Sequence, residues 1–235
     1  MVQCRLILEN GTIAEGTGFG FKKTVYGEVV FNTGMAGYQE NLTDPSYRGQ
    51  ILIMSHPVIG NYGVNDRFTE SSRVQVTGCV VREICRQVSP MYGGHDLDSY
   101  LEANKTPGIS GLDTRSLIIS IRKGGTLRGA ISFDEEPEEV LEKLRKMKYP
   151  SETNLVAEVS TDRVIRYENE GKKKVALIDC GVKSSIVREL RQRFSVVQVP
   201  YDTPASFFRN EELDGIFISN GPGDPEPCDY VIKAI

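Results

Sequence analysis

Residues 215–230 read GIFISNGPGDPEPCDY, an apolar run that ends in two glycines around a proline. The run shows no polar and apolar alternation, and the same is true of VALIDC at residues 175–180. Between these two runs, residues 182–193 have helical spacing and residues 195–200, SVVQVP, favour a further strand. Strands and a helix in this order, without alternation, predict a parallel α/β sheet covered on both faces.

The turn after the last of these strands has a composition suited to binding an anion. Open α/β sheets bind their ligands at the carboxyl ends of the strands, and residues 220–224 follow such an end. Gly221 and Gly223 let the backbone take a positive φ and bring its N–H groups close to a ligand, while Pro222 stiffens the turn. Amides aimed at an oxyanion are worth roughly 3–4 kcal/mol each. A plain connecting turn would use the same residues, so the turn alone leaves both interpretations open.

The composition is that of a globular protein with one or two domains. The chain has 235 residues, of which 39% are hydrophobic, and a net charge of −4. This charge argues against nucleic acid or an acidic membrane surface as a partner. The chain has no signal peptide pattern and no apolar run of about 18 residues, so we expect neither export nor a membrane span.

The cysteines point to a reducing compartment. Five are present, an odd number, and none has C-x-x-C spacing; they are Cys4, Cys79, Cys85, Cys180 and Cys228. This pattern argues against a disulfide framework and a zinc knuckle. We therefore expect a cytoplasmic protein.

The amino-terminal part of the chain has a different pattern of apolar residues. Residues 3–82 alternate short apolar runs with glycine-bearing turns, which predicts strands. Residues 96–124 have helical spacing, with Asp113 and Thr114 as candidate caps of a second helix. Residues 137–148, PEEVLEKLRKMK, predict another helix, with proline and acids early and bases late.

Two longer stretches carry a family resemblance. GEVVFNTGMAGYQENLTDPSYRGQILIMSHPVIGNYGVND at residues 27–66 and SGLDTRSLIISIRKGG at residues 110–125 resemble two signatures of the carbamoyl phosphate synthetase small subunit family. Residues 176–190 are similar to the first strand and helix of that family's class I glutamine amidotransferase domain, where a strand also ends in Gly-Pro-Gly. Other glutamine amidotransferases share the turn but lack the preceding domain. The resemblance spans essentially the whole chain.

The resemblance implies a fold for each part of the chain. Residues 1–150 would form the small-subunit amino-terminal domain, with a swivelling β/β/α fold. Residues 151–172, polar and charged, would be a linker. Residues 173–235 would be the start of a flavodoxin-like α/β/α class I glutamine amidotransferase domain.

The resemblance also implies a function. The family's small subunit hydrolyses glutamine and passes ammonia to a large subunit, which makes carbamoyl phosphate from bicarbonate and ATP for arginine and pyrimidine biosynthesis. The chain has no G-x-x-x-x-G-K-[ST] loop, and EGTGFGF at residues 15–21 is too weakly patterned for a phosphate site. We therefore expect no cofactor in this chain, and ATP and Mg²⁺ in the large subunit of a heterodimer.

Three residues match the family's site. Gly221 would donate its N–H to the oxyanion, Gly223 would contact bound glutamine through its backbone, and Ser46 would reach the same glutamine from the amino-terminal domain. From its surroundings alone, Ser46 is better interpreted as a turn serine beside Asp44 and Pro45, and only the resemblance favours the role in binding glutamine. In the segment GVKSS, Gly181 and Lys183 fit the family pattern. Cys180, Ser184 and Ser185 depart from its commoner aromatic and asparagine choices.

The family's nucleophilic cysteine, histidine and glutamate lie downstream of Gly-Pro-Gly and are not in this chain. His56 and His95 both lie in the first domain, and neither Cys180 nor Cys228 has a histidine nearby in the sequence. We therefore expect these 235 residues alone to lack glutaminase activity. The alternative is a noncatalytic glutamine-binding or assembly module complete at Ile235, and a coding sequence that continues into a Gly-x-Cys-x-Gly motif would exclude it.

Overall fold

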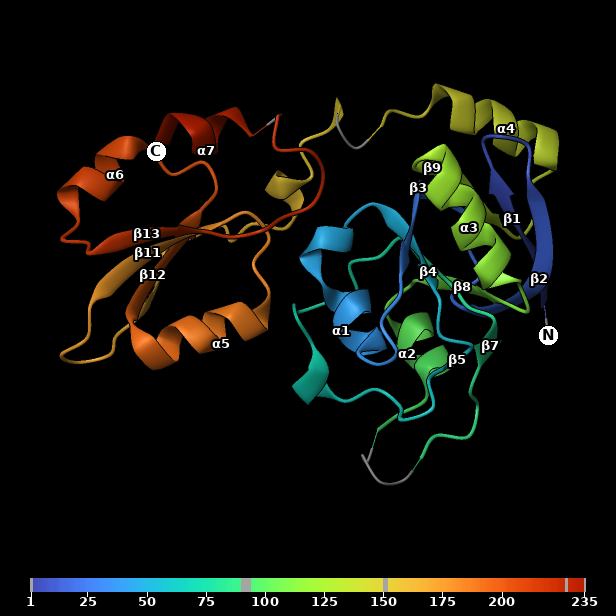
Figure 1. The fold of residues 1–235 in the computed structure, drawn as a ribbon, viewed down its shortest axis with the longest axis horizontal. Coiled ribbons are helices and arrows are strands. Elements are labelled where there is room, and N and C mark those ends of the chain that lie inside the picture. Colours follow the sequence, from blue (N-terminus) through green and yellow to red (C-terminus); the bar gives the residue numbers. More distant parts are fainter. Residues whose placement is uncertain (1, 90–93, 150–151, 227, 235) are drawn as a thin grey trace. The chain divides into compact units, whose positions relative to one another are not determined.

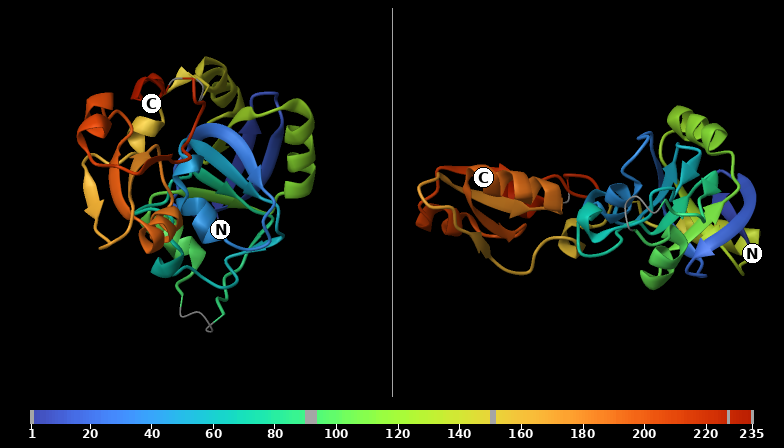
Figure 2. Two further views of the ribbon diagram at one scale, coloured as in Figure 1. Left: turned by 60° about the vertical axis from the view of Figure 1, so that its left-hand side comes forward. Right: turned by 90° about the horizontal axis from the view of Figure 1, so that it is seen from below.

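The computed structural model describes residues 2–89, 94–149, 152–226 and 228–234. The chain divides into two compact units, residues 1–149 (unit 1) and residues 150–235 (unit 2), which Figures 1 and 2 show from several sides. Each unit has its own sheet and its own buried core. No helix among the described residues is long and apolar enough to cross a membrane.

Unit 1 is built around a closed barrel. Its strands are β1 (Val2–Leu8), β2 (Ile13–Gly20), β3 (Val25–Asn32), β4 (Gln50–Met54), β6 (Gly78–Val80), β8 (Pro107–Ser110) and β9 (Leu127–Ser132). Within the described residues their order is β1-β2-β8-β6-β4-β3-β9, and β9 pairs back with β1 to close the barrel. Neighbours from β3 through β4 and β6 to β8 are parallel, and the other pairs are antiparallel. A separate two-stranded sheet joins β5 (Val58–Ile59) and β7 (Glu83–Ile84).

Helices cover the barrel through apolar stripes. They are α1 (Tyr38–Thr43), α2 (Leu97–Ala103), α3 (Thr114–Gly124) and α4 (Pro137–Lys146), with short 3₁₀ turns η1 (Pro45–Tyr47) and η2 (Asp66–Phe68). Leu117 and Ile121 of α3 join a core cluster with barrel residues, and Val140 and Leu144 of α4 join another. The Asp113 side chain accepts a hydrogen bond from the Ser116 N–H at 3.1 Å, so Asp113 is confirmed as the cap of α3, whereas Thr114, the other candidate, is the first residue of the helix.

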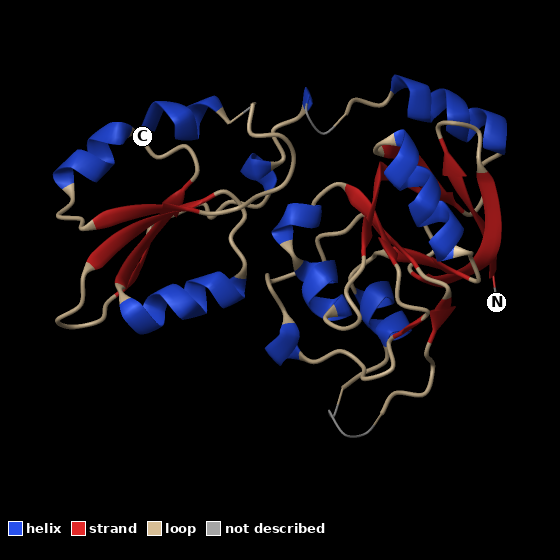
Figure 3. Ribbon diagram, in the orientation of Figure 1, coloured by secondary structure: helices blue, strands red, loops and turns tan. Residues whose placement is uncertain are grey.

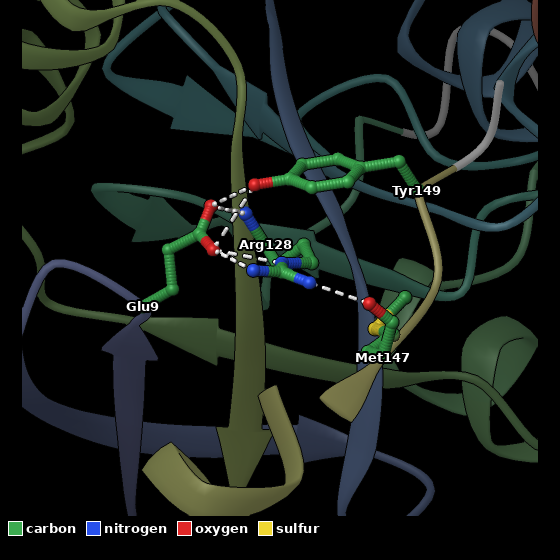
Figure 4. A network of polar contacts seen from close by, with 4 residues as sticks. All are labelled: Glu9, Arg128, Met147 and Tyr149. Atoms are coloured by element: carbon green, nitrogen blue, oxygen red, sulfur yellow. Dashed lines mark hydrogen bonds and ion pairs between the residues drawn. The ribbon is translucent and has the colours of Figure 1, made fainter. Parts of the chain in front are cut away.

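A largely buried ion pair joins three segments of unit 1 (Figure 4). The Glu9 carboxylate accepts hydrogen bonds from the Arg128 backbone N–H at 2.8 Å and from its Nε at 2.7 Å. Arg128 also donates to the Met147 carbonyl just after α4, and its guanidinium lies 4.2 Å from the ring centroid of Tyr149. Both charged side chains are only 13% exposed. Arg128 thus connects the segment after β1, strand β9 and the end of α4.

Unit 2 contains a four-stranded sheet in the order β10-β12-β11-β13. Its strands are β10 (Ile165–Tyr167), β11 (Lys174–Asp179), β12 (Ser195–Pro200) and β13 (Gly215–Ile218). Strand β11 pairs in parallel with both β12 and β13, which confirms the predicted parallel arrangement. Helix α5 (Ser184–Arg193) lies on one face, and α6 (Ala205–Asn210) and α7 (Asp229–Ala234) lie on the other (Figures 1 and 3). Leu177 faces the α5 side and Ile178 faces the α6 and α7 side, since they belong to separate core clusters.

Two strands lie where the sequence analysis expects other structure. Strand β8 falls within the stretch with helical spacing, between α2 and α3. Strand β10 falls within the predicted linker 151–172, which also contains the 3₁₀ turn η5 (Val156–Glu158). β10 pairs antiparallel with β12, so the segment interpreted as a linker is part of the sheet. Strand β8 shows no polar and apolar alternation, and β10 alternates over three residues only, so neither carries a clear strand signal; both are held by pairing with distant strands.

Candidate active site

The Gly-Pro-Gly turn follows β13 at the carboxyl end of the parallel sheet. At Gly221 the backbone passes so close to β11 that an added Cβ atom would lie 2.0 Å from the Cys180 carbonyl oxygen. Gly223 has a positive φ of 77°, a conformation that L side chains rarely adopt. The two glycines are therefore required for different reasons, close approach at one and backbone conformation at the other.

The turn borders a pocket of about 300 Å³ within unit 2. The pocket is lined by Val156, Cys180, the turn residues 218–225, Cys228, Val231 and Ile232. Within the described part of the chain, neither the Gly221 nor the Gly223 N–H donates a hydrogen bond to another residue. Both amides are thus available to a ligand at the edge of a largely apolar pocket.

Asp179, which the sequence analysis does not single out, organises the neighbouring loop. It is buried at the end of β11. One carboxylate oxygen accepts hydrogen bonds from the N–H groups of Gly181 and Val182, both at 2.9 Å. The other accepts from the Gln198 side chain at 2.7 Å and the Thr161 N–H at 3.1 Å. The sequence signal that could have identified it is an aspartate at the end of an apolar strand and two residues before a glycine, because a side chain there can accept hydrogen bonds from the N–H groups of the following turn.

A second set of contacts ties the end of β11 to the end of β13. The Cys180 N–H donates to the Ser219 hydroxyl at 2.9 Å, and that hydroxyl donates to the Asn220 carbonyl at 2.8 Å. Ser219 also donates its N–H to the Ile178 carbonyl at 3.1 Å. These bonds fix the residues that lead into Gly221 and determine where its amide lies.

The two cysteines of the pocket have thiols that are protonated at neutral pH. Burial, followed by the Cys228 thiol and Asp179, raises the pKa of Cys180 to about 11. Burial and Asp224 raise the pKa of Cys228. An activated thiol nucleophile has a lowered pKa, so both shifts run in the opposite direction.

Ser46 and the two histidines belong to unit 1. Ser46 is half-buried in η1, where the Asp44 side chain accepts a hydrogen bond from its N–H at 2.9 Å. His56 Nδ1 lies 2.9 Å from the Val58 carbonyl oxygen, and His95 forms a bridge with Val64. Among the described residues, no group of three or more histidine, cysteine, aspartate or glutamate side chains could hold a metal ion.

Comparison with protein families gives two matches along the chain. Residues 6–131 match the model for the carbamoyl-phosphate synthase small chain, CPSase domain. The chain belongs to the carbamoyl-phosphate synthase small chain family. Residues 176–235 match the model for glutamine amidotransferase class-I, so the resemblance found from the sequence is confirmed for both parts.

Members of this family are similar along almost the whole chain. The carbamoyl phosphate synthase small chains of Archaeoglobus fulgidus and Methanopyrus kandleri are 44% identical over 236 residues and 46% identical over 242 residues; each match covers 100% of this chain and 66% of the relative. The pyrimidine-specific small chain of Bacillus subtilis is 44% identical over 233 residues, covering 98% of this chain and 63% of the relative. This chain therefore spans just under two thirds of the length of these relatives.

Solved structures add no argument about the fold. An aminopeptidase from Aneurinibacillus sp. strain AM-1 has a TM-score of 0.34 and 14% identity, over 55% of this chain and 30% of that chain. The family assignment rests on the sequence matches.

Proposed function

We propose that this chain is part of the glutamine-hydrolysing subunit of a carbamoyl phosphate synthase, and that it supplies ammonia to a large subunit. The observation that carries the proposal is Gly221: it follows a parallel strand of the glutamine amidotransferase match, at a point where no side chain fits. Its N–H borders a pocket of about 300 Å³ and has no partner within the described residues. An amide in this setting can stabilise the oxyanion that forms when the glutamine side-chain amide is attacked.

The site residues have separate roles in this proposal. Gly221 donates to the oxyanion, and Gly223 positions glutamine through its backbone. Ser46, from unit 1, contacts the same glutamine. Asp179 and Ser219 act as positioning residues, because their hydrogen bonds hold the two strand ends on which the turn depends.

The domains and partner follow from the family. Residues 1–150 form a swivelling β/β/α domain, and residues 173–235 belong to the first part of a flavodoxin-like α/β/α domain, whose sheet also includes β10 from the segment 151–172. The partner is the large subunit of a cytoplasmic heterodimer, which uses ATP and Mg²⁺ to make carbamoyl phosphate for pyrimidine and arginine biosynthesis. The name of the Bacillus subtilis relative supports the pyrimidine route.

A second candidate, a glutamine-binding or assembly module without its own turnover, is favoured by the two thiols. Both pocket cysteines have raised pKa values, and both histidines of the sequence lie in unit 1. Both candidates predict glutamine binding and no rapid hydrolysis by these 235 residues alone. They differ on whether the chain hydrolyses glutamine when it is joined to a segment that carries the family's nucleophilic cysteine.

The test is to mix the 235-residue chain with the large subunit and to supply glutamine and then ammonia. We expect the two proteins to co-purify and the complex to make carbamoyl phosphate from ammonia. We expect glutamate release only at a background rate, thousands of times below that of an intact glutaminase. Clean separation of the two proteins at micromolar concentration contradicts the proposal. Glutamate release at an enzyme-like rate that is lost in Cys180→Ser or Cys228→Ser would reveal a nucleophile that the proposal excludes.

A further inference from the structure

The pocket beside the Gly-Pro-Gly turn contains two cysteines from different elements. Cys180 follows the last residue of β11, and Cys228 precedes the first residue of α7. Both line the pocket, and Cys228 packs against the apolar cluster that contains Cys180. Two thiols that share one small pocket can react together, which a single cysteine cannot do.

Both side chains also face the same turn. The Cys180 Cβ lies 3.2 Å from the position of a Cβ on Gly221, and the Cys228 thiol is directed to the Asp224 carbonyl, with Sγ 3.9 Å from that oxygen. The Cys228 thiol also raises the pKa of Cys180, as a cause second to burial. Cys180 therefore lies beside the first residue of the segment 221–224, and Cys228 lies beside its last residue.

We propose that Cys180 and Cys228 form a dithiol site that exchanges with small-molecule disulfides and closes into an intramolecular disulfide across the pocket. The site does not depend on the proposed glutaminase role. Cys228 reacts first, because it is half-buried whereas Cys180 is buried. Closure links the carboxyl end of β11 to the start of α7 and encloses the Gly-Pro-Gly turn in the resulting loop.

The reaction balances without a bound cofactor. At alkaline pH, where Cys228 loses its proton despite its raised pKa, the Cys228 thiolate attacks one sulfur of a small-molecule disulfide such as oxidised glutathione, which breaks its S–S bond and releases one thiolate. The Cys180 sulfur, after losing its proton, attacks the Cys228 sulfur of the mixed disulfide, and the second small thiol leaves. Two protein thiols are oxidised, one disulfide is reduced to two thiols, and the protons pass to the departing thiolates.

The other three cysteines provide internal controls. Cys4 and Cys79 are buried in unit 1, and Cys85 is partly exposed there. Trypsin separates the two reacting cysteines, because Cys180 lies in the peptide 175–183 and Cys228 in the peptide 210–233. Each peptide contains a single cysteine, so a linked pair of these peptides identifies the bridge without ambiguity.

The experiment incubates the native 235-residue chain with oxidised glutathione, then quenches, alkylates and digests it. We expect the free thiols counted in denaturant to fall from the five of the sequence to three, with peptides 175–183 and 210–233 linked. In Cys180→Ser, Cys228 should stop at the mixed disulfide with glutathione; in Cys85→Ser, the same linked pair should form. A dithiol reductant should restore all five thiols.

Two results overturn the proposal. The first is a wild-type chain in which Cys228 remains a stable glutathione adduct while Cys180 stays alkylatable. The second is a set of linked peptides that joins either cysteine to Cys4, Cys79 or Cys85. Both results are measured on the wild-type chain, so the test does not depend on whether a variant folds.

Discussion

The carbonyl oxygen of Cys180 lies 2.0 Å from the position that a Cβ atom would take on residue 221. No real Cβ atom approaches a carbonyl oxygen so closely, and the obstructing atom is backbone that cannot rotate away. Gly221 is therefore demanded by the packing of two neighbouring strand ends. This requirement is independent of any ligand, and it brings the Gly221 amide to the rim of the pocket.

Gly221→Ala should destabilise unit 2, because the added methyl group must push the turn away from β11. Overpacking of this kind costs about 1–3 kcal/mol. The matched control is Gly215→Ala on β13, where an added Cβ would meet only a Val175 methyl at 3.9 Å, an ordinary contact. Chemical denaturation of both variants measures the difference. Equal unfolding free energies would contradict the close approach of the Cys180 carbonyl to Gly221.

Asp179→Asn should loosen the loop between β11 and α5. The asparagine oxygen can still accept from the Gly181 and Val182 N–H groups, but its NH₂ group would face the Gln198 and Thr161 donors. Leaving buried donors unsatisfied costs about 1–3 kcal/mol. Asp202→Asn, on an exposed turn of the same unit, serves as the control and should change stability by less than about 0.5 kcal/mol. Hydrogen exchange at residues 180–182 should quicken only in the first variant.

Arg128→Met should destabilise unit 1 far more than Arg5→Met. Removing Arg128 leaves the Glu9 carboxylate buried without its cation, which costs about 3–5 kcal/mol. The Arg5–Glu15 pair is exposed, with 3.5 Å between its atoms, and such pairs are worth less than about 1 kcal/mol. Thermal unfolding of both variants tests this ranking. A double variant Glu9→Gln/Arg128→Met should lose less than the sum of its single variants, because it leaves no unpaired charge.

Stability should depend on pH through Glu135. The Lys143 ammonium, 2.7 Å away, and the Tyr26 hydroxyl lower the pKa of this carboxyl below its ordinary value of 4.5. A lowered pKa in the folded state stabilises the fold above the unfolded-state pKa, and this contribution is lost as the pH falls through the folded-state pKa. Glu135→Gln should therefore be less stable than wild type at neutral pH and match it in strong acid. Lys143→Met should weaken the same pH dependence without removing it, because the Tyr26 hydroxyl still donates to Glu135; an unchanged profile in either variant would contradict the pairing.

The sequence predicts the elements whose residues carry local signals. Apolar runs without alternation identify β11, β12 and β13, and the spacing of Leu117 and Ile121 with the cap at Asp113 identifies α3. Closure of the barrel was not predictable, because it depends on the pairing of β9 with both β1 and β3. The paired residues of β1 and β9 lie more than a hundred positions apart in the sequence. Strand β10 was missed for the same reason, since only its pairing with β12 makes it a strand.

The candidate site was predictable in part. The glycines of the turn are visible in sequence, but the reason for Gly221, a carbonyl from another strand, appears only in three dimensions. Asp179 was missed because its four partners come from three segments: residues 181 and 182, Gln198 and Thr161. The contact of Ser46 with the substrate glutamine stays a prediction from the family resemblance.

The most direct test of the oxyanion role uses a chimera in which this chain is joined, at the aligned boundary, to the remaining part of the Archaeoglobus fulgidus small chain. With the large subunit present, glutamate release and ammonia-dependent carbamoyl phosphate synthesis are measured separately for the chimera, its Gly221→Val variant and its Gly215→Ala control. Gly221→Val should lower glutaminase turnover by about a hundredfold or more, as removal of an oxyanion donor does, and leave the ammonia-dependent rate largely intact. An unchanged glutaminase rate in Gly221→Val would contradict the account.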